Sequence, residues 1–258
     1  SSRPGYGVTA ESVAGVRHLT GEPDRPPARV AAAVTDQLTA AYAAFGAMMA
    51  LLTREKTGKG QVVDAALYEA AFSLMEPYVP AYERNGTIPK RIGPKLPNAA
   101  PNSLYLSKDG EYVLISANND AIFRRLAEVM GQPELADDPR YATQLARSQR
   151  VDEVDEIVGR WAAQVDSKEL EQKLLDASVP TARVYTIKDI FEDPHFRQRE
   201  QLIEMPHDKF GKLTVIGIAP RLSETPGEVY QLGGEIGRDT REVLKTISAT
   251  VKELIDVE

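Results

Sequence analysis

The 258-residue sequence predicts a fold of both helices and strands, divided between two domains. A long, almost uncharged segment before residue 54 has the spacing of a helix, whereas residues 103–116 alternate around a tight turn, as a β-hairpin does. Between them, residues 86–101 contain glycine and proline at short intervals, which is typical of a linker. A chain of this length can bury a substantial core and hold two modest domains.

The segment that follows Asp36 predicts the principal helix of the first part. It carries no charge before Arg54, and its large apolar side chains recur at the spacing of one helix face: Leu38, Tyr42, Phe45, Met49 and Leu52. The opposite face is mostly alanine, with Thr39 and Gly46, so another backbone can approach it closely. A helix that is apolar nearly all round is normally buried. We therefore expect Asp36 at the start of a buried helix, where the helix dipole favours a carboxylate or an anionic ligand.

The residues after this helix predict its end and a second helix. The run R-E-K-T-G-K-G at 54–60 places cations near the carboxyl end, followed by two glycines that free the chain to turn. We expect a short strand over residues 61–64. A helix is expected from Ala65 to about Met75, which Pro77 and Pro80 interrupt or end.

The second part opens with a predicted hairpin over residues 103–106 and 111–116, whose turn contains Gly110 for a left-handed position. Asn119 or Asp120 is expected to cap the next helix. Asp-Pro pairs at 138–139 and 193–194 each place an acid before a proline that suits the first position of a helix. The other elements expected are helices over 121–130, 151–165, 168–177 and 238–256, a strand over 182–185, and a hairpin over 201–205 and 212–216.

Composition excludes several classes of function. The net charge of −7 disfavours nucleic acid as a main partner. The chain has no cysteine, which excludes disulfides, thiolate catalysis and cysteine-ligated metals, and its three histidines lack metal-ligand spacing, so no metal site is expected. Residues 37–53 are slightly short for a membrane span and include polar side chains, so no membrane partner is expected. Nothing resembles a signal peptide, and we expect a cytoplasmic protein.

Two roles for Asp36 stay open from the residues alone. With Thr35, it has the composition of a helix N-cap, whose side chain accepts a hydrogen bond from the first turn. Alternatively, a carboxylate at a helix N-terminus, beside small residues that admit a ligand, is suited to act as a nucleophile. No P-loop, H-E-x-x-H or G-x-S-x-G motif offers a competing site.

Several sequence blocks, spread over nearly the whole chain, match the order of blocks in a known enzyme family. They are R-P-G-Y (3–6), L-T-G-E-P (19–23), Asp36, R-E-K-T-G-K-G-Q-V-V-D-A-A-L (54–67), A-P-N-S-L-Y-L-S-K-D-G (100–110), P-E-L-A-D-D-P-R-Y-A-T (133–143), V-P-T-A-R-V (179–184) and D-P-H-F-R-Q-R (193–199). Together they resemble the family III CoA-transferases, the CaiB/BaiF-like family of formyl-CoA and carnitine CoA-transferases. The T-G-K-G-Q-x-V-D block after the aspartate is the most specific of them.

The resemblance implies a fold and a domain plan. The fold is α/β, with part of a Rossmann-like large domain plus a smaller α+β domain, and two subunits interlocked as a homodimer. It assigns residues 1–85 to a large-domain segment with the Asp36 helix, 86–101 to the linker, 102–200 to the small domain and 201–258 to a return to the large domain. Family chains carry a further N-terminal portion, so the resemblance covers roughly the C-terminal two-thirds of a family chain.

The resemblance also implies a reaction, the transfer of CoA from an acyl-CoA donor to a carboxylic acid, with Asp36 as the catalytic nucleophile. Tyr6, Leu67 and Gly93 fall at substrate- and CoA-binding positions, and Gly7 stands where the family often has an acid. No cofactor is implied, because the CoA thioester is a substrate. Acyl-CoA and small carboxylates are the expected partners. If the acceptor is a dicarboxylic acid, the candidates to bind its second carboxylate are Lys90, Arg91 and Lys95.

Two alternatives to a transferase are considered. The α-methylacyl-CoA racemases of the same superfamily use the aspartate as a proton-transfer base, together with a histidine and a glutamate. Here those two positions hold Tyr6 and Asn119, which favours transfer. The other alternative is a non-catalytic fragment that keeps the fold without the N-terminal portion. Affinity for CoA distinguishes the non-catalytic fragment from the two enzymes. A covalent adduct on Asp36 distinguishes the transferase from both alternatives.

Overall fold

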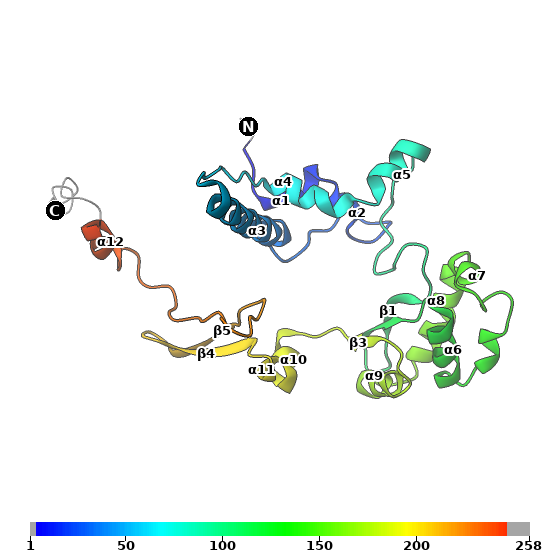
Figure 1. Cartoon of the computed structure of the whole chain (residues 1–258). Coiled ribbons are helices and arrows are strands. Elements are labelled where there is room, and N and C mark those ends of the chain that lie inside the picture. The colour runs from blue at the N-terminus through cyan, green and yellow to red at the C-terminus, as the bar shows by residue number, and fades with distance from the viewer. Residues whose placement is uncertain (1–3, 247–258) are drawn as a thin grey trace. The chain divides into compact units, whose positions relative to one another are not determined.

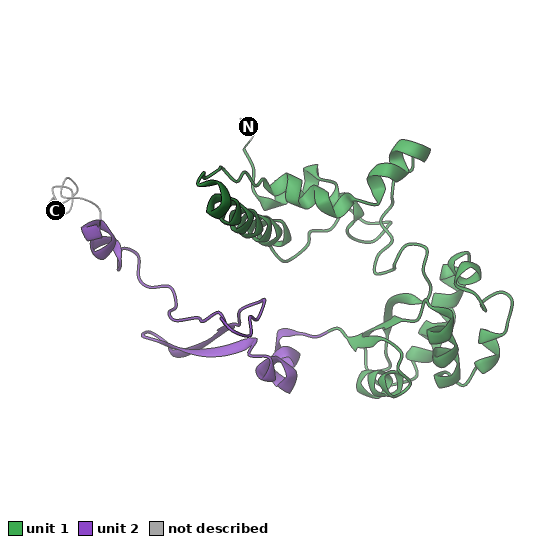
Figure 2. Ribbon diagram, in the orientation of Figure 1, with its two compact units in different colours: residues 1–184 green, residues 185–258 purple. Residues whose placement is uncertain are grey.

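The structure is a computed structural model that describes residues 4–246 (Figure 1). The chain divides into two compact units, Ser1–Val184 and Tyr185–Glu258 (Figure 2). This division falls at neither end of the predicted small domain, 102–200, so the domain limits taken from the resemblance stay a prediction. None of the helices in residues 4–246 has both the length and the apolar content that crossing a membrane requires.

The first half of unit 1 is helical. It contains α1 (Gly7–Val13), α2 (Val16–Leu19), α3 (Val34–Thr57), α4 (Leu67–Phe72), the short 3₁₀ helix η1 (Ser73–Met75) and α5 (Tyr78–Asn85). Helices α1 and α4 pack against each other and against α3. The main predicted helix is confirmed as α3. Its last turn carries Arg54 and Lys56, and Gly58 follows in a left-handed conformation with φ of +69°.

The prediction that α3 is buried all round is wrong for the described part of the chain. Phe45, Met48 and Leu52 expose 64%, 58% and 62% of their surfaces, and Thr35 is the buried residue of the helix. The reason is coverage: α3 has 24 residues, whereas the helices packed on it have seven and six. The small-residue face does admit a close neighbour, since a Cβ on Gly46 would lie 2.7 Å from Cγ1 of Val63.

Residues 61–64 do not form the predicted strand. They are irregular, and the described strands pair only with one another, in a three-stranded and a two-stranded sheet. A strand needs a neighbour for its backbone N–H and C=O groups. The segment instead runs along α3 at Gly46 and leads into α4. Pro80 lies within the first turn of α5, where its missing N–H costs no helical hydrogen bond.

The second half of unit 1 is a small sheet covered by helices. Strands β1 (Asn102–Leu106), β2 (Tyr112–Ser116) and β3 (Thr181–Arg183) form an antiparallel sheet in that order, with Tyr105 opposite Val113. The helices are α6 (Asp120–Val129), η2 (Pro133–Ala136), α7 (Gln144–Ser148), α8 (Val151–Ala162) and α9 (Ser167–Asp176). The hairpin and the helices predicted near 121, 151 and 168 are thus confirmed within a few residues.

The main hydrophobic core lies in this second half. Its fully buried side chains come from the sheet and from α6, α8 and α9, and include Val113, Ile115, Leu126, Val158, Leu170 and Leu174. Burial of each such aliphatic side chain contributes about 1.5–3 kcal/mol relative to leaving it exposed. The sheet and its helices therefore hold together by apolar packing that α3 lacks.

A buried arginine ties the loops of this half together. Arg147, on α7, has no exposed surface, and its guanidinium lies over the Phe123 ring at 4.4 Å. It donates hydrogen bonds to three backbone carbonyl oxygens and one carboxylate: Ala100 at 3.0 Å, Tyr141 at 2.7 Å, Asn118 at 2.7 Å and Asp120 at 2.8 Å. The buried charge is thereby fully surrounded by acceptors.

The two Asp-Pro pairs form different structures. At 193–194 the prediction is confirmed, because Pro194 starts α11 and Asp193 accepts a hydrogen bond from the His195 N–H at 2.8 Å. At 138–139 the predicted helix is absent and the chain turns. Asp138 accepts from the backbone N–H of Arg140 at 2.9 Å and from its guanidinium at 2.7 Å.

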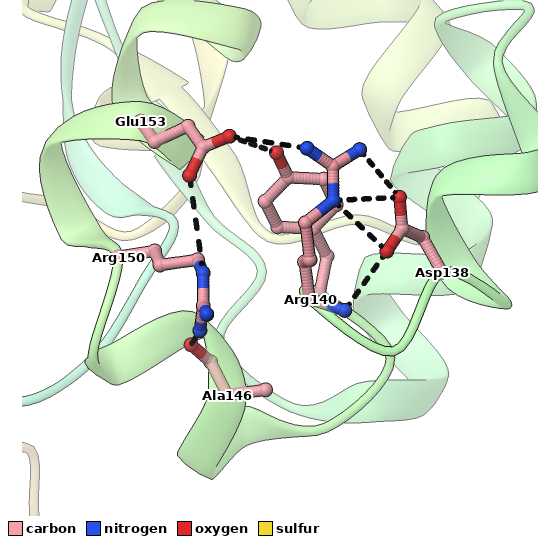
Figure 3. Close-up of polar contacts among 6 residues, drawn as sticks. Asp138, Arg140, Ala146, Arg150 and Glu153 are labelled. Atoms are coloured by element: carbon pink, nitrogen blue, oxygen red, sulfur yellow. Dashed lines mark hydrogen bonds and ion pairs between the residues drawn. The ribbon is translucent and has the colours of Figure 1, made fainter.

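Figure 3 shows how neighbouring residues hold this turn at 138–141. The carboxylate of Glu153 accepts a hydrogen bond from Tyr141 and pairs with the guanidinium groups of Arg140 at 3.6 Å and Arg150 at 4.0 Å. The fork between Asp138 and Arg140 therefore continues into α8, where Glu153 lies. The local side-chain bonds replace the helical turn that proline alone would favour.

Unit 2 contains α10 (Ile187–Glu192), α11 (Pro194–Gln198), the antiparallel strands β4 (Leu202–His207) and β5 (Gly211–Ile216), and α12 (Thr240–Thr246). The predicted hairpin near 201–216 is confirmed. The predicted helix over 238–256 is present as α12, and its part beyond residue 246 lies outside the described residues.

Replacing Arg147 by lysine is expected to lower the free energy of unfolding by about 2–4 kcal/mol, because lysine cannot supply the planar set of donors and leaves buried carbonyls unpaired. Denaturant titration of the variant measures the change. The matched control is Arg160→Lys, whose exposed pair with Glu156 lies on the surface of α8, and which should cost about 0.5 kcal/mol or less. Equal effects of the two substitutions would contradict the role of Arg147.

The turn between β1 and β2 predicts a pH dependence. Asp109 accepts hydrogen bonds from Ser107 Oγ at 2.5 Å, from Ser167 Oγ at 2.8 Å and from the Ser167 N–H at 3.0 Å. These bonds, with Ser107 the largest cause, lower the pKa of Asp109 to about 2 from its ordinary 3.8. The charged form is therefore favoured by folding. Its stabilising contribution is complete above the ordinary pKa and is lost as the pH falls toward 2.

Thermal unfolding of the wild type and of Asp109→Asn measures this effect. We expect the wild type to unfold at the higher temperature at pH 6, and the difference to shrink between pH 4 and pH 2. A difference of the same size at pH 6 and pH 2 would show that the charge of Asp109 contributes nothing.

Candidate active site

A cavity of about 340 Å³ lies where the start of α1 meets the start of α3. Its size falls in the range of small-molecule sites. The elements that build it are the first turns of the two helices and the loop before α3. The lining residues are Tyr6, Gly7, Val8, Glu11, Arg29, Ala32, Ala33, Thr35 and Asp36.

Asp36 is the third residue of α3, so of the two roles left open by the sequence it does not take that of the N-cap. The capping position is Ala33, and no side chain there bonds to the first turn. The Asp36 side chain is exposed and its Oδ2 accepts a hydrogen bond from Thr35 Oγ1 at 3.2 Å. A carboxylate in the first turn lies near the positive end of the helix dipole. Because capping does not occupy this carboxylate, it is available to a ligand in the cavity.

Gly7 is the residue that lets the two helix starts approach. A Cβ at this position would overlap Asp36 Oδ2 and lie 2.7 Å from Oγ1 of Thr35, which is itself 5% exposed. A larger side chain at position 7, including the acid expected from the resemblance, would therefore need the Asp36 carboxylate to move. In this chain the Asp36 carboxylate lines the cavity, and position 7 carries no acidic side chain.

Tyr6 joins this cavity to a second one. The second cavity, of about 510 Å³, is lined mainly by apolar groups of α1 and the start of α4: Pro4, Gly5, Tyr6, Thr9, Ala10, Val13, Leu67 and Tyr68. Tyr6 is 82% exposed and lines both cavities. The structure thus brings together three of the four residues predicted for the site, namely Asp36, Tyr6 and Leu67.

Gly93 lies apart from these cavities and lines neither of them. Its φ is +65°, its N–H donates to the Gly21 carbonyl at 3.2 Å, and a Cβ there would lie 2.7 Å from the Glu22 carboxylate. Glycine is required here by the backbone conformation and by the close approach of Glu22. A substrate-binding role for Gly93 stays a prediction.

Two of the cations expected to receive a carboxylate are engaged elsewhere. Arg91 donates to the carbonyl oxygens of His18, Glu22 and Arg25 at 3.1, 3.1 and 3.2 Å. Lys95 pairs with Asp152 at 2.6 Å and with Asp155 at 3.4 Å. These two cations hold loops in place, and neither they nor Lys90 lines the cavity at Asp36.

Sequence reasoning missed two charged residues of the cavity. Glu11, on α1, is 6% exposed, and its Oε1 accepts a hydrogen bond from the Val30 N–H at 3.3 Å. Arg29 lies at the end of residues 21–29, a proline-rich segment whose composition is typical of a surface loop and offers no sign of a site. One signal was available, because Arg29 is the only charged residue between Arg25 and Asp36.

Comparison with known proteins identifies the family. The model of CoA-transferase family III matches residues 1–240. The chain belongs to this family. A succinyl-CoA–D-citramalate CoA-transferase of Chloroflexus aurantiacus is 42% identical over 93% of this chain and 60% of its own length. The beta subunit of a succinyl-CoA–L-malate CoA-transferase of the same organism is 35% identical over 98% of this chain and 64% of its own.

A solved structure supports the fold. A CaiB/BaiF family protein from Brucella suis superposes with a TM-score of 0.79 at 29% identity, covering 95% of this chain and 64% of that protein. The mixed helix and sheet architecture predicted for a family III CoA-transferase is thereby confirmed. The chain spans about 60% of the length of the first curated relative that it matches.

The geometry at Gly7 predicts the effect of adding one methyl group. Gly7→Ala should displace the Asp36 carboxylate. If this carboxylate reacts in CoA transfer, as we propose, the rate should fall by about 100-fold, because a displacement of about 1 Å can have this effect on a reacting group. The matched control is Gly159→Ala on α8, which lines neither cavity; the added Cβ there meets the Tyr105 ring at an ordinary 3.7 Å, and the rate should change less than about twofold. Equal rates for the two variants would contradict a strict spatial requirement at position 7.

Proposed function

We propose that the protein transfers CoA from an acyl-CoA donor to a carboxylic acid acceptor, with Asp36 as the nucleophile. The observation that carries the proposal is the Asp36 carboxylate, which lies in the first turn of α3 and lines a cavity without capping the helix. Tyr6 lines this cavity and also a second, mainly apolar one. Asp36 also stands at the position of the family's catalytic aspartate. The second cavity, with Leu67, suits the pantetheine arm of CoA, which is long and partly apolar.

The reaction proceeds in four displacements at carbonyl carbons. An Asp36 oxygen attacks the donor thioester, and the C–S bond breaks to release the CoA thiolate and leave an acyl-aspartyl anhydride. The thiolate attacks the aspartyl carbonyl of this anhydride, which releases the donor acid and forms an aspartyl-CoA thioester. The acceptor carboxylate attacks that thioester and frees the thiolate, giving a second anhydride. The thiolate then attacks the acceptor's acyl carbon, which yields the new acyl-CoA and restores Asp36.

This chemistry fits a site without a catalytic histidine. Each attacking and leaving group is an anion, since an ordinary aspartate is ionised at neutral pH, so no proton has to be removed. The tetrahedral oxyanions need hydrogen-bond donors, and the backbone N–H groups of Thr35 and Asp36, in the first turn of α3, are suited to this role. Water must be excluded, because an anhydride hydrolyses readily.

The substrate class follows from the relatives. Their names pair succinyl-CoA with D-citramalate or L-malate, which are both dicarboxylic acids. We therefore extend the proposal to succinyl-CoA or a similar donor and a small dicarboxylic acceptor, in the interlocked homodimer that the resemblance implies. Racemisation is less well supported, because Tyr6 replaces its histidine and Asn119, which replaces its glutamate, caps α6 by accepting from the Ala121 N–H at 2.9 Å.

Substitution of the nucleophile tests the proposal. Asp36→Asn is expected to lower CoA transfer by about 10⁴-fold or more, since the amide cannot form the anhydride, with the unfolding midpoint preserved. The control Asp208→Asn removes an exposed carboxylate between β4 and β5 that lines neither cavity at Tyr6, and it should leave the rate within about twofold of the wild type. Turnover by Asp36→Asn near the wild-type rate would refute the assignment.

Trapping of the intermediate separates the transferase from its alternatives. Incubation with an acyl-CoA followed by hydroxylamine or borohydride, and mass analysis of peptides, should locate the modification on the peptide that contains Asp36. A racemase or a non-catalytic chain forms no such adduct. An unmodified peptide from protein shown to bind CoA would count against the proposal.

A further inference from the structure

The cavity at Asp36 contains one cation, Arg29, and two acids, Glu11 and Asp36. Within residues 4–246, the Arg29 side chain forms neither an ion pair nor a hydrogen bond, and it is exposed. Arg91 and Arg147, by contrast, each bind three backbone carbonyl oxygens. The guanidinium of Arg29 is therefore available to an anion that enters the cavity.

The loop that presents Arg29 is fixed at both ends. At its start, Arg91 binds the carbonyl oxygens of His18, Glu22 and Arg25. At its end, the Ala28 N–H donates to the Thr20 carbonyl at 2.9 Å. These contacts, made by backbone atoms of the loop, give it a defined path although its side chains are largely exposed.

Glu11 holds the residue after Arg29 against α1. Its carboxylate is buried and accepts from the Val30 N–H at 3.3 Å. The position of the Arg29 backbone is therefore set by a hydrogen bond on one side and by the loop closure at Ala28 on the other. Such anchoring orders the backbone that carries a binding side chain before the ligand arrives, which lowers the entropic cost of binding.

We propose that Arg29 binds the free carboxylate of a dicarboxylic acyl group whose other carboxyl carbon reacts with Asp36. The inference rests on the proposed function, and it names the residue that distinguishes dicarboxylic from monocarboxylic acyl groups. A planar guanidinium binds a carboxylate through two parallel hydrogen bonds, a geometry that a monocarboxylic acyl group cannot use at its far end. Arg29 thus selects donors and acceptors with a second carboxylate, the role first assigned to Lys90, Arg91 or Lys95.

Two donors of equal chain length test the inference. Succinyl-CoA ends in a carboxylate, whereas butyryl-CoA ends in a methyl group and is otherwise matched in length. The rate of adduct formation on Asp36 at subsaturating donor is measured for the wild type, Arg29→Gln, Arg29→Lys and the control Arg25→Gln. Arg25 lies on the same exposed loop, and its side chain does not line the cavity.

In Arg29→Gln, the rate with succinyl-CoA is expected to fall by about 10- to 100-fold, because a charge-assisted hydrogen bond is lost. The rate with butyryl-CoA is expected to fall by less than about twofold. Arg29→Lys keeps the charge without the two-point geometry and should recover part of the preference for succinyl-CoA. Arg25→Gln should behave as the wild type.

The contrary outcomes are distinguishable. A wild type that forms no Asp36 adduct with either donor refutes the proposed function and this inference with it. An adduct in the wild type together with an unchanged succinyl preference in Arg29→Gln overturns the role of Arg29 alone. An equal loss with both donors also overturns it, because Arg29 would then contact a part common to both, such as CoA.

Discussion

Position 7 has no side chain, and the candidate site depends on the room that this leaves for the Asp36 carboxylate and the Thr35 hydroxyl at the start of α3. A Cβ on Gly7 would occupy the space of the Asp36 carboxylate. With glycine there, Asp36 faces a cavity whose wall includes the backbone of α1, and Tyr6 connects that cavity to the one at Leu67. The absence of a side chain at position 7 thus lets the Asp36 carboxylate adjoin a cavity that Tyr6 connects to a second, mainly apolar one.

Apolar packing and the candidate site occupy different parts of unit 1. The buried core lies among the sheet, α6, α8 and α9, whereas much of the apolar surface of α3 is exposed in the described chain. The loops around the site are held by directional polar contacts instead. Arg91 holds the loop that leads to Arg29, and Glu11 holds its end. Such contacts fix a backbone path where little apolar surface is buried, since each bonded carbonyl or N–H would otherwise require a water partner.

The charges of the cavity suit chemistry in which every reactant is an anion. In the reaction proposed for this site, Asp36 has to stay unpaired, because a cation that formed a tight ion pair with it would compete with the substrate. Arg29 meets this condition, because it lines the same cavity without pairing with Asp36 within the described residues. In the proposed site, the guanidinium of Arg29 would attract an anionic substrate and leave the Asp36 carboxylate exposed.

The sequence by itself determined the local elements. The β1–β2 hairpin follows from its turn at Gly110, the α6 cap from Asn119 and the end of α3 from Gly58, because each depends on backbone preferences of a few neighbouring residues. The motif order also identified the family, whereas its assignment of Asp36 as the nucleophile stays a prediction. Only the tertiary structure decided how charges are used: Arg91 is bound to loop carbonyls, Gly93 lies beside Glu22, and Arg29 lines the cavity. Pattern and spacing report which residues are near in sequence, whereas a binding site is made by residues that long-range packing brings together.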